Sequence, residues 1–404
     1  MTRPRALIST IEPIDGGVPT MTRCLARMLE ELGIEPVFAW YEPWSRRPDL
    51  SVPLPSLLRG RRPGERSCTA YGDHEAHGLG AWLPELEFTH YLPRRSWREL
   101  IASCRWNLAV TGNPLCAVPY ARLGLPFLAW VATPWAADRS ERVRSFSPPR
   151  RLLDRGLNGP VLRRLERSVL RAPGARILAL SAYTAAELEA IAGRPMDDVL
   201  LMPVDTHRYR PDPSRGRPWR LGFCGRWLDP RKDIDLLLRA TSLLVKRGHP
   251  VELVLAGEND PEPLRARWSE LGLEGRVVTH PHLGPDALAT VLQGLDLFVI
   301  PSHQEGLCIA ALEAMACGVP VVSTRCGGPQ TYVLPDRTGL LVDRAAEDLA
   351  AAVTAIATDR GRRDSLGAGA LAWVRENATP EAARSLVRRH LQALAPLPDP
   401  LAVA

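Results

Sequence analysis

Residues 295–322 have the sequence Leu295-Asp-Leu-Phe-Val-Ile-Pro-Ser-His-Gln-Glu305-Gly-Leu-Cys-Ile-Ala-Ala-Leu-Glu313-Ala-Met-Ala-Cys-Gly318-Val-Pro-Val-Val322. The apolar start predicts a buried strand, and a polar loop with Glu305 follows it. Glu313 falls in the helix that comes next, and Gly318 predicts its end before a second strand. A strand–loop–helix–strand order is typical of an open parallel sheet, which binds ligands at the carboxyl ends of its strands. The two glutamates therefore lie where a ligand is expected.

The rest of the chain alternates strand-like and helix-like segments in two blocks, separated by a proline-rich stretch without periodicity at 202–218. Within the first block, residues 42–95 are rich in Pro, Gly and Arg and predict long loops around short elements. This order predicts an α/β fold with two Rossmann-like, doubly wound parallel-sheet domains. Strands are expected at 6–10, 36–40, 106–111, 127–132 and 177–181 in the first block, and at 220–224, 251–256, 277–279, 297–300 and 319–323 in the second.

Composition excludes several protein classes. The chain has 404 residues, of which 45% are hydrophobic, so it can bury more than one core. No apolar run approaches the roughly 20 residues that span a bilayer, and Glu12 interrupts the first apolar run too early for a signal peptide. The eight cysteines show no metal-ligand spacing. A net charge of +6 does not by itself indicate a nucleic-acid partner.

Two further motifs accompany the glutamates. The first is Phe223-Cys-Gly225-Arg226-Trp-Leu-Asp-Pro-Arg-Lys232, in which a glycine ends a strand and two cations follow in a loop. The second is Gly16-Gly17-Val18 after the first strand, a weaker signal because paired glycines are common in turns. Together the motifs resemble the retaining glycosyltransferases of family 4, with their Glu-x7-Glu signature and GT-B fold. The resemblance is strong over residues 200–345 and weaker before them.

The GT-B resemblance implies two domains facing a cleft, with a last helix that crosses back to the first domain. We expect an acceptor-binding domain at 1–203, a linker at 204–218 and a nucleotide-sugar-binding domain at 219–375. The crossover helix and tail would follow at 376–404, with 376–394 helical.

The resemblance also implies roles for single residues. Arg226 and Lys232 would hold the donor diphosphate, since fixed cations stabilise the charge that develops on the leaving group. Glu305 would position the transferred sugar, and Glu313 would bind the ribose. Further donor contacts are expected at Gly225, Gly306, Leu307, Cys308, Gly16 and Gly17, and contacts near the acceptor or sugar at Thr133 and Asp138.

A metal site is the less favoured interpretation of Asp233-Ile-Asp235. Asp233 stands where a helix is expected to begin, so an N-cap is the better interpretation. With cations at the diphosphate, we expect transfer without a metal or other cofactor, using a UDP- or GDP-sugar as co-substrate.

Two positions depart from the family pattern. Thr133 stands where many members have a histidine near the donor sugar, and it cannot act as an imidazole base. We therefore expect an altered donor preference, toward a sugar without an ordinary 6-hydroxyl. Cys308 stands where glycine is usual, and its Cβ would narrow the donor pocket.

A belt with ten arginines runs from Arg139 to Arg171. One interpretation of this belt is peripheral contact with an anionic membrane. The other is an amphipathic helix that packs on the first domain and exposes its arginines to solvent. We favour the second interpretation for the helix expected at 161–170. We expect a cytoplasmic protein, with the inner face of the membrane as the place of such a contact. The oligomeric state stays open.

The sequence thus predicts a retaining glycosyltransferase that moves a sugar from a nucleotide-diphosphate sugar to a hydroxyl acceptor. The acceptor could be a polysaccharide, a lipid-linked glycan or a small molecule. The alternative is a catalytically silent GT-B protein that senses a sugar nucleotide or serves as a partner subunit; a GT-B hydrolase or epimerase is the rival among enzymes.

Overall fold

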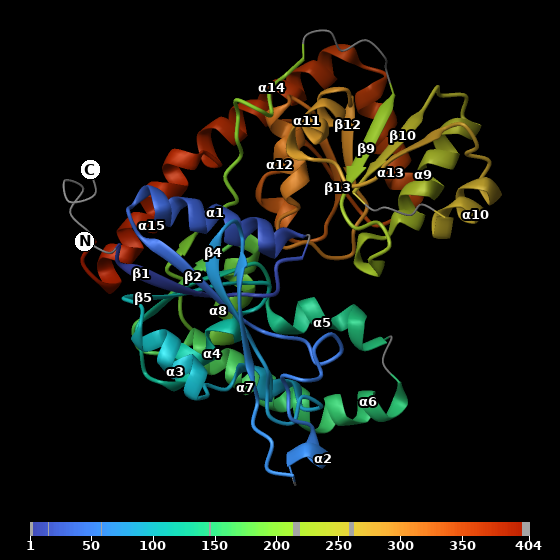
Figure 1. Cartoon of the computed structure of the whole chain (residues 1–404). Helices are drawn as coiled ribbons and strands as arrows, with labels where there is room; N and C mark the ends of the chain where they lie inside the picture. The colour runs from blue at the N-terminus through green and yellow to red at the C-terminus, as the bar shows by residue number, and fades with distance from the viewer. Residues whose placement is uncertain are drawn as a thin grey trace. The chain divides into compact units, whose positions relative to one another are not determined.

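The computed structural model describes residues 3–14, 16–57, 59–144, 147–212, 219–257 and 262–397, without the side chains at 138, 140–142 and 144. The chain forms two compact units (Figure 1). The first contains Met1–Leu200 and Arg384–Ala404, and the second contains Leu201–Ala383. The expected linker has no helix or strand over its described residues, 204–212.

The first unit is built on an eight-stranded sheet in the order β3-β4-β2-β1-β5-β6-β7-β8. β3 and β4 are antiparallel, and every other neighbouring pair is parallel. The middle strands are apolar along their length because helices cover both faces of such a sheet. The strands are β1 (Arg5–Ser9), β2 (Glu35–Tyr41), β3 (Glu65–Ala70), β4 (His74–Leu79), β5 (Trp106–Thr111), β6 (Phe127–Val131), β7 (Ala175–Ala179) and β8 (Asp198–Val199).

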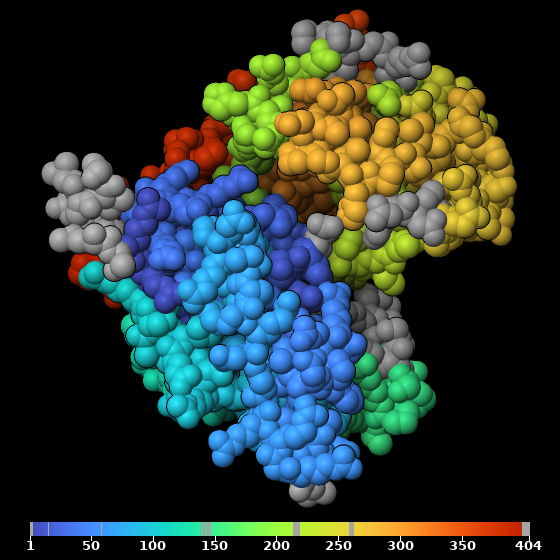
Figure 2. Space-filling view, in the orientation of Figure 1, coloured from blue at the N-terminus to red at the C-terminus, as the bar shows by residue number. Residues whose placement is uncertain are grey.

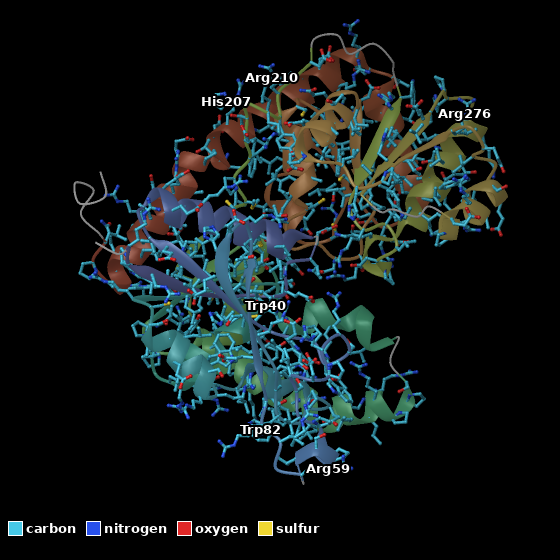
Figure 3. The ribbon with its side chains drawn as sticks, viewed as in Figure 1. Trp40, Arg59, Trp82, His207, Arg210 and Arg276 are labelled. Atoms are coloured by element: carbon cyan, nitrogen blue, oxygen red, sulfur yellow. The ribbon has the colours of Figure 1, made fainter. Side chains whose placement is uncertain are left out.

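Helices and aromatic side chains complete the core of the first unit. Trp40, on β2, is buried, and its indole N–H donates to the carboxylate of Glu42 at 2.9 Å (Figure 3). The helices are α1 (Gly17–Glu31), α2 (Leu54–Leu57), η1 (Glu87–Tyr91), α3 (Arg95–Ala102), η2 (Pro114–Ala117), α4 (Val118–Arg122), α5 (Trp135–Arg144), α6 (Pro148–Leu153), η3 (Asp154–Asn158), α7 (Gly159–Leu170) and α8 (Ala182–Ala192).

The second unit has a fully parallel six-stranded sheet in the order β11-β10-β9-β12-β13-β14. Its strands are β9 (Arg220–Cys224), β10 (Glu252–Ala256), β11 (Val277–His280), β12 (Leu297–Ile300), β13 (Val321–Thr324) and β14 (Gly339–Val342). Its helices are η4 (Pro230–Lys232), α9 (Ile234–Lys246), α10 (Glu262–Glu270), α11 (Pro285–Gln293), α12 (Ile309–Ala316), η5 (Gly328–Thr331), α13 (Ala346–Ala357) and α14 (Arg360–Asn377), and α15 (Pro380–Leu394) begins in it.

Each sheet has one place where the strand order reverses. In the first unit this switch point lies between β1 and β5, and in the second between β9 and β12. The connections after the two strands leave in opposite directions there and open a crevice at the carboxyl ends. The expected α/β class with two Rossmann-like domains is confirmed. The topology also indicates where a crevice lies in each unit.

The prediction for residues 42–95 was incomplete. Two strands, β3 and β4, lie inside this stretch and extend the sheet beyond β2. Figure 2 shows the stretch in light blue on the face of the first unit in view. His74 and His77 interrupt the apolar pattern of β4, and β3 alternates polar side chains on an edge. Periodicity alone therefore gave no strand signal.

The expected helix at 376–394 is two helices. α14 ends at Asn377, and α15 begins at Pro380, whose ring cannot continue a helix from the preceding turn. Residues from Arg384 belong to the first unit. There the Arg389 guanidinium and the His390 ring both contact the carboxylate of Asp198.

No helix in the described ranges combines the length and the apolar character needed to cross a membrane.

Candidate functional site

An ion pair stands at the switch point of the second unit. Lys232 ends the short helix η4 that follows β9, and Glu305 lies in the loop after β12. The Lys232 Nζ donates to Glu305 Oε1 at 2.6 Å, and the Ser302 hydroxyl donates to the same oxygen at 2.9 Å. Burial is the largest single influence and lowers the pKa of Lys232, but the charge of Glu305, its hydrogen bond to Lys232 and the Cys308 thiol together raise this pKa above its usual value. Lys232 is therefore a fixed, fully charged cation.

The loop that carries Glu305 is held by its neighbour after β13. The Glu305 N–H donates to the Cys326 carbonyl oxygen and the Gly328 N–H to the Glu305 carbonyl oxygen, both at 2.8 Å. Gly328 is needed for this approach, because a Cβ there would lie 2.1 Å from the Gly306 carbonyl oxygen. The Tyr332 hydroxyl donates to the Leu307 carbonyl oxygen at 2.6 Å. Residues 305–307 are thus fixed without help from a ligand.

Cys308 precedes α12 in a left-handed conformation, with φ 65°. This conformation is strained for a residue with a Cβ and is the ordinary one for glycine. Burial raises the pKa of the Cys308 thiol well above its usual value, and Glu305 adds to the rise while Lys232 opposes it. Cys308 therefore lies beside the Lys232–Glu305 pair as a neutral thiol.

Gly225 lets the chain turn at the end of β9. Its φ is 152°, and Gly257 packs so closely that a Cβ there would lie 2.6 Å from the Gly225 carbonyl oxygen. Cys224 is the last residue of β9 and is partly buried, and burial raises the pKa of its thiol to about 12. Glu313 adds to this rise and Lys232 opposes it, so both charges act at the end of β9.

Glu313 lies on α12 and is partly buried. Burial raises its pKa to about 7, and a hydrogen bond from the Tyr209 hydroxyl limits the rise. Tyr209 belongs to a turn in which its N–H donates to the Asp205 carbonyl oxygen at 2.9 Å. Near neutral pH, Glu313 is therefore divided between a form that can donate a hydrogen bond and an anion that only accepts.

Arg226 differs from Lys232 in its exposure. Its side chain is 57% exposed, and its guanidinium donates to Asp229 at 3.2 Å. Asp229 also accepts from Arg231 at 2.8 Å. Burial raises the pKa of Asp229, but the hydrogen bond and charge of Arg231 prevail and lower it to about 2. Arg226 thus belongs to an Arg–Asp–Arg group next to Lys232 in the sequence, and the Arg226 guanidinium is largely exposed to solvent.

Asp233 takes the N-cap position of α9 but makes no capping hydrogen bond through its side chain. Its φ is 47°, and its carboxylate instead contacts Arg344 at 3.1 Å and His303 at 3.2 Å. Asp235 contacts Arg239 at 2.9 Å and also pairs with Arg267. The predicted N-cap is correct in position and wrong in its hydrogen bond.

The remaining predicted residues belong to the first unit. Gly16 precedes α1 with φ 142°, a Cβ there would meet open space, and Gly17 is the first helical residue. Thr133 is buried after β6, and its N–H donates to the Gly112 carbonyl oxygen at 2.7 Å. Asp138 lies on α5, but its side chain is outside the described part of the structure.

The arginine belt is not uniformly solvated. Arg139 is buried and paired with both Glu87 and Asp154, so it braces α5 against η1 and η3. The helix α7 buries its Leu162, Leu165 and Val169 face, which confirms the amphipathic interpretation of that segment. On α6 and η3, by contrast, large apolar side chains are exposed: Leu152 by 74%, Leu153 by 37% and Leu157 by 40%.

Comparison with known proteins identifies the family. The model described as "Glycosyl transferases group 1" matches residues 218–359. A D-inositol 3-phosphate glycosyltransferase of Arthrobacter sp. (strain FB24) is 32% identical over 376 residues, which cover 88% of this chain and 85% of that protein. The chain belongs to the group 1 family of glycosyltransferases. The resemblance seen in the motifs is thereby confirmed.

Other family members match over less of their length. The D-inositol 3-phosphate glycosyltransferase of Rhodococcus jostii (strain RHA1) is 35% identical over 191 residues, covering 43% of this chain and 42% of that protein. The chain spans about half the length of several curated relatives that it matches. The family assignment therefore rests on the longer match.

Solved structures show the same fold. Sucrose-phosphate synthase from Thermosynechococcus elongatus superimposes with a TM-score of 0.70 at 20% identity, over 98% of this chain and all of that one. Anabaena Alr3699/HepE in complex with UDP-glucose gives 0.70 at 16% identity, over 96% and 100%. At these identities the likeness establishes the GT-B fold of the chain.

Sequence reasoning missed two pairings at the second switch point, that of Arg231 with Asp229 and that of Tyr209 with Glu313. The Gly225–Lys232 motif contains both Asp229 and Arg231, but spacing does not show which charged side chains pair with each other. Tyr209 lies 104 residues before Glu313, its hydrogen-bond partner, and no local pattern joins them. The first pairing depends on side-chain directions within one loop, and the second on bringing distant segments side by side.

Proposed function

We propose that this protein transfers a sugar from a nucleoside-diphosphate sugar to a hydroxyl group of an acceptor. The observation that carries the proposal is the Lys232–Glu305 pair at the β9/β12 switch point, with Glu313 acting on the same strand end. Family membership supports it, as do the Anabaena structures of the same fold that hold UDP and UDP-glucose.

In this proposal Lys232 holds the diphosphate while keeping one N–H on Glu305. Arg226 would turn from solvent onto the same phosphates, since a guanidinium can bind them with two hydrogen bonds. The absence of a Cβ at Gly225 and Gly306 would let the backbone approach the donor. Ionised Glu313 would accept hydrogen bonds from the ribose hydroxyls.

Glu305 would position the transferred sugar. Lys232 and Ser302 both use Oε1, so the Oε2 atom is the one turned to sugar hydroxyls. The N–H groups of Leu307 and Cys308 would add donors on the same side. In the first unit, Gly16 and Gly17 would serve the donor, and Thr133 and Asp138 the acceptor or the sugar.

We propose a retaining, metal-independent reaction. The acceptor oxygen forms a bond to the anomeric carbon on the face from which the phosphate leaves, and the bond between that carbon and the phosphate oxygen breaks. The acceptor proton passes to the leaving phosphate, so no imidazole base is required at Thr133. The cations at 226 and 232 stabilise the charge that develops on the diphosphate. Asp233 and Asp235, the candidates for a metal motif, are both engaged by arginine.

A donor screen tests this function. The full chain is incubated with UDP- and GDP-sugars, and mass spectrometry records which one is bound, hydrolysed or transferred. We expect one sugar nucleotide to be used, and use to be lost in Lys232→Ala but kept in Lys246→Ala, which removes an exposed lysine of α9. Equal turnover in the Lys232→Ala variant, or no sugar nucleotide bound by the wild type, would refute the proposal.

The donor sugar itself is a finer proposal. Because Thr133 replaces a histidine of the family pattern, we propose a donor without an ordinary 6-hydroxyl. The same screen decides this point, since preference for a hexose with a free 6-hydroxyl would contradict it.

For the belt, we propose that contact with an anionic membrane is made by α6 and η3 rather than by Arg139. Exposed Leu152, Leu153 and Leu157 alternate there with arginines at 150, 151 and 155, a pattern suited to the headgroup boundary. Such a contact would place the protein at the inner face of the cytoplasmic membrane. Cosedimentation with vesicles with and without anionic lipid, using Leu152→Ser with Leu228→Ser as control, tests this.

A further inference from the structure

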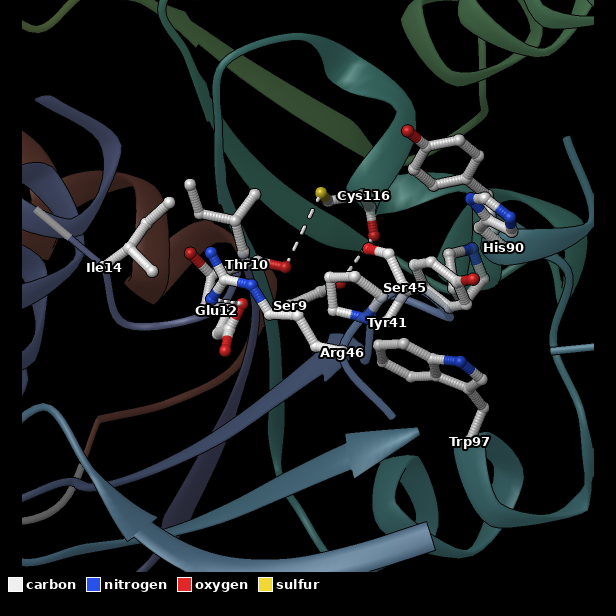
Figure 4. A pocket seen from close by; sticks show the side chains of 14 residues that line it. Ser9, Thr10, Glu12, Ile14, Tyr41, Ser45, Arg46, His90, Trp97 and Cys116 are labelled. Carbon is white, nitrogen blue, oxygen red and sulfur yellow. Dashed lines mark hydrogen bonds and ion pairs between the residues drawn. The ribbon is translucent and has the colours of Figure 1, made fainter. Parts of the chain in front are cut away.

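A cavity in the first unit lies at that unit's own switch point, between the carboxyl ends of β1 and β5. Its volume is about 450 Å³ (Figure 4). Ser9 and Thr10 enter it from the end of β1, and Cys116 from the helix η2 after β5. The Ser9 hydroxyl donates to the Cys116 carbonyl oxygen at 2.7 Å, which ties the two sides of the floor together. Nothing in the motifs pointed to this cavity.

One wall of the cavity is aromatic. The rings of Tyr41 and His90 are stacked, with centroids 3.8 Å apart and planes within 8°. Trp97, on α3, lines the same side and is 3% exposed. A flat wall of this kind can bind a ring that stacks on it, and an aromatic pair contributes more binding free energy than its buried area alone would give.

His90 adds one directed polar group to the wall. Burial lowers its pKa, so the ring is neutral at pH 7. Its Nε2–H donates to the Pro84 carbonyl oxygen at 2.9 Å, which leaves Nδ1 as a hydrogen-bond acceptor. The ring can therefore receive a proton donor such as a hydroxyl, but it offers no positive charge.

The charges of the cavity cancel each other. Arg46 is the sole lysine or arginine among the described lining residues, and its guanidinium donates to the Glu12 carboxylate at 2.6 Å. Glu12 is the less exposed partner, with 20% of its side chain accessible against 54% for Arg46. An incoming anion would meet a neutralised arginine and, next to it, a carboxylate. A phosphate group is disfavoured by this arrangement.

We propose that this cavity binds the acceptor and that it selects an uncharged hydroxyl compound with a flat apolar ring face. The inference rests on the proposed function and deepens it. Tyr41 stacks on the ring, and His90 Nδ1 accepts a hydrogen bond from a hydroxyl of the same compound. The Glu12–Arg46 pair excludes phosphorylated acceptors, in contrast to the relatives named for D-inositol 3-phosphate.

The test compares two probes on the full chain, p-nitrophenyl β-D-glucopyranoside and D-inositol 3-phosphate, by calorimetry in the presence of UDP. We expect the neutral aromatic probe to bind at least about tenfold more tightly, the equivalent of 1.4 kcal/mol. Tyr41→Ala and His90→Ala should each weaken its binding about tenfold. His74→Ala is the matched control, since His74 also packs on an aromatic ring of this unit but does not line the cavity.

A variant that removes a charge should increase the affinity for a probe instead of lowering it. Glu12→Gln leaves Arg46 without its carboxylate and should strengthen binding of D-inositol 3-phosphate about tenfold while leaving the neutral probe unchanged. The inference is overturned if the phosphate probe binds more tightly to the wild type, if neither probe binds, or if the cavity variants bind like the control. UDP binding shows which proposal has failed. If only the inference about the acceptor is wrong, UDP still binds and its binding depends on Lys232. If the proposed function is wrong, UDP does not bind.

Discussion

The two switch points have the same topology and opposite chemistry. In the second unit the crevice between β9 and β12 gathers Lys232, Glu305 and the Arg226–Asp229–Arg231 group. In the first unit the crevice between β1 and β5 has an aromatic wall, a neutral histidine and a single ion pair. Parallel sheets supply the crevice in both cases, and the side chains at the strand ends decide what it can bind.

The comparison suggests a division of labour. Fixed charges recognise a ligand that is itself charged and whose charge grows during the reaction, which is the case for a diphosphate leaving group. Stacking surfaces recognise shape and apolar area and work without net charge. We expect variants of one region to change its own ligand and leave the other ligand's binding intact.

The largest effect is expected for Lys232→Ala. The change removes the cation of the second switch point and leaves the buried carboxylate of Glu305 unpaired. Transfer should fall on the order of a thousandfold in kcat, and the free energy of unfolding by about 3 kcal/mol. Kinetics and urea unfolding measure both. Loss of acceptor-probe binding in this variant would break the proposed independence of the two regions.

Gly328→Ala should come next. Its Cβ would overlap the Gly306 carbonyl oxygen and displace the Glu305 loop, although no charged group is altered. UDP binding, measured by calorimetry, should weaken about a hundredfold, equivalent to about 2.8 kcal/mol. Gly284→Ala is the control, because a Cβ there meets open space. Equal affinities in the two variants would show that the loop need not be held in place.

Arg226→Ala should have a smaller effect. The guanidinium is exposed, and Asp229 keeps its other partner, Arg231, so the fold should be unaffected. Losing a charge-assisted bond to the diphosphate should lower kcat/KM between about ten- and a hundredfold. Arg337→Ala, which removes an equally exposed and ion-paired arginine, should be neutral. An unchanged kcat/KM in Arg226→Ala would remove this residue from the site.

The smallest effect concerns pH. With a pKa of about 7 in the free protein, Glu313 becomes an acceptor for ribose hydroxyls as the pH rises, so UDP affinity should increase about tenfold from pH 6 to pH 8. The phosphates of UDP titrate in the same range, so Glu313→Gln is measured alongside, and the difference between the two profiles isolates Glu313. Parallel profiles would show that Glu313 does not contact the nucleotide.

The same group predicts the pH dependence of stability. Its pKa is raised above the value of about 4.3 in an unfolded chain, so between that value and 7 the folded state binds the proton more strongly. Stability relative to Glu313→Gln should therefore fall as the pH rises through this window. Urea midpoints at pH 4.5, 6 and 7.5 would reveal it.

Much of the second unit could be predicted from the sequence. The segment from β12 to β13 is indicated by a continuous apolar run, a polar loop and a glycine-terminated helix, all within 30 residues. Lys232 and Glu305, 73 residues apart, could be assigned to one site because the motifs around them resemble those of family 4. Their direct contact, and the exposure of Arg226 to solvent, depend on side-chain directions that motifs do not encode.

The first unit shows what local patterns leave out. Tyr41, His90, Trp97 and Glu12 belong to four segments, and each has an unremarkable neighbourhood in the sequence. β3 and β4 escaped notice because an edge hairpin alternates weakly, and their pairing to β2 comes from the sheet as a whole. A cavity of this kind carries no signature until the chain is folded.

The sequence by itself determined most of the alternation of strands and helices, because this follows from periodicity along the chain. It also indicated the family and the charged residues of the second unit, through the resemblance of its short motifs to known members. Only the tertiary structure decided which charges cancel, as in Glu12 with Arg46, and which groups shift their proton affinity, as Glu313 does beneath Tyr209. Both depend on burial and on distances of a few ångströms between segments far apart in the chain, and no one-dimensional pattern specifies them.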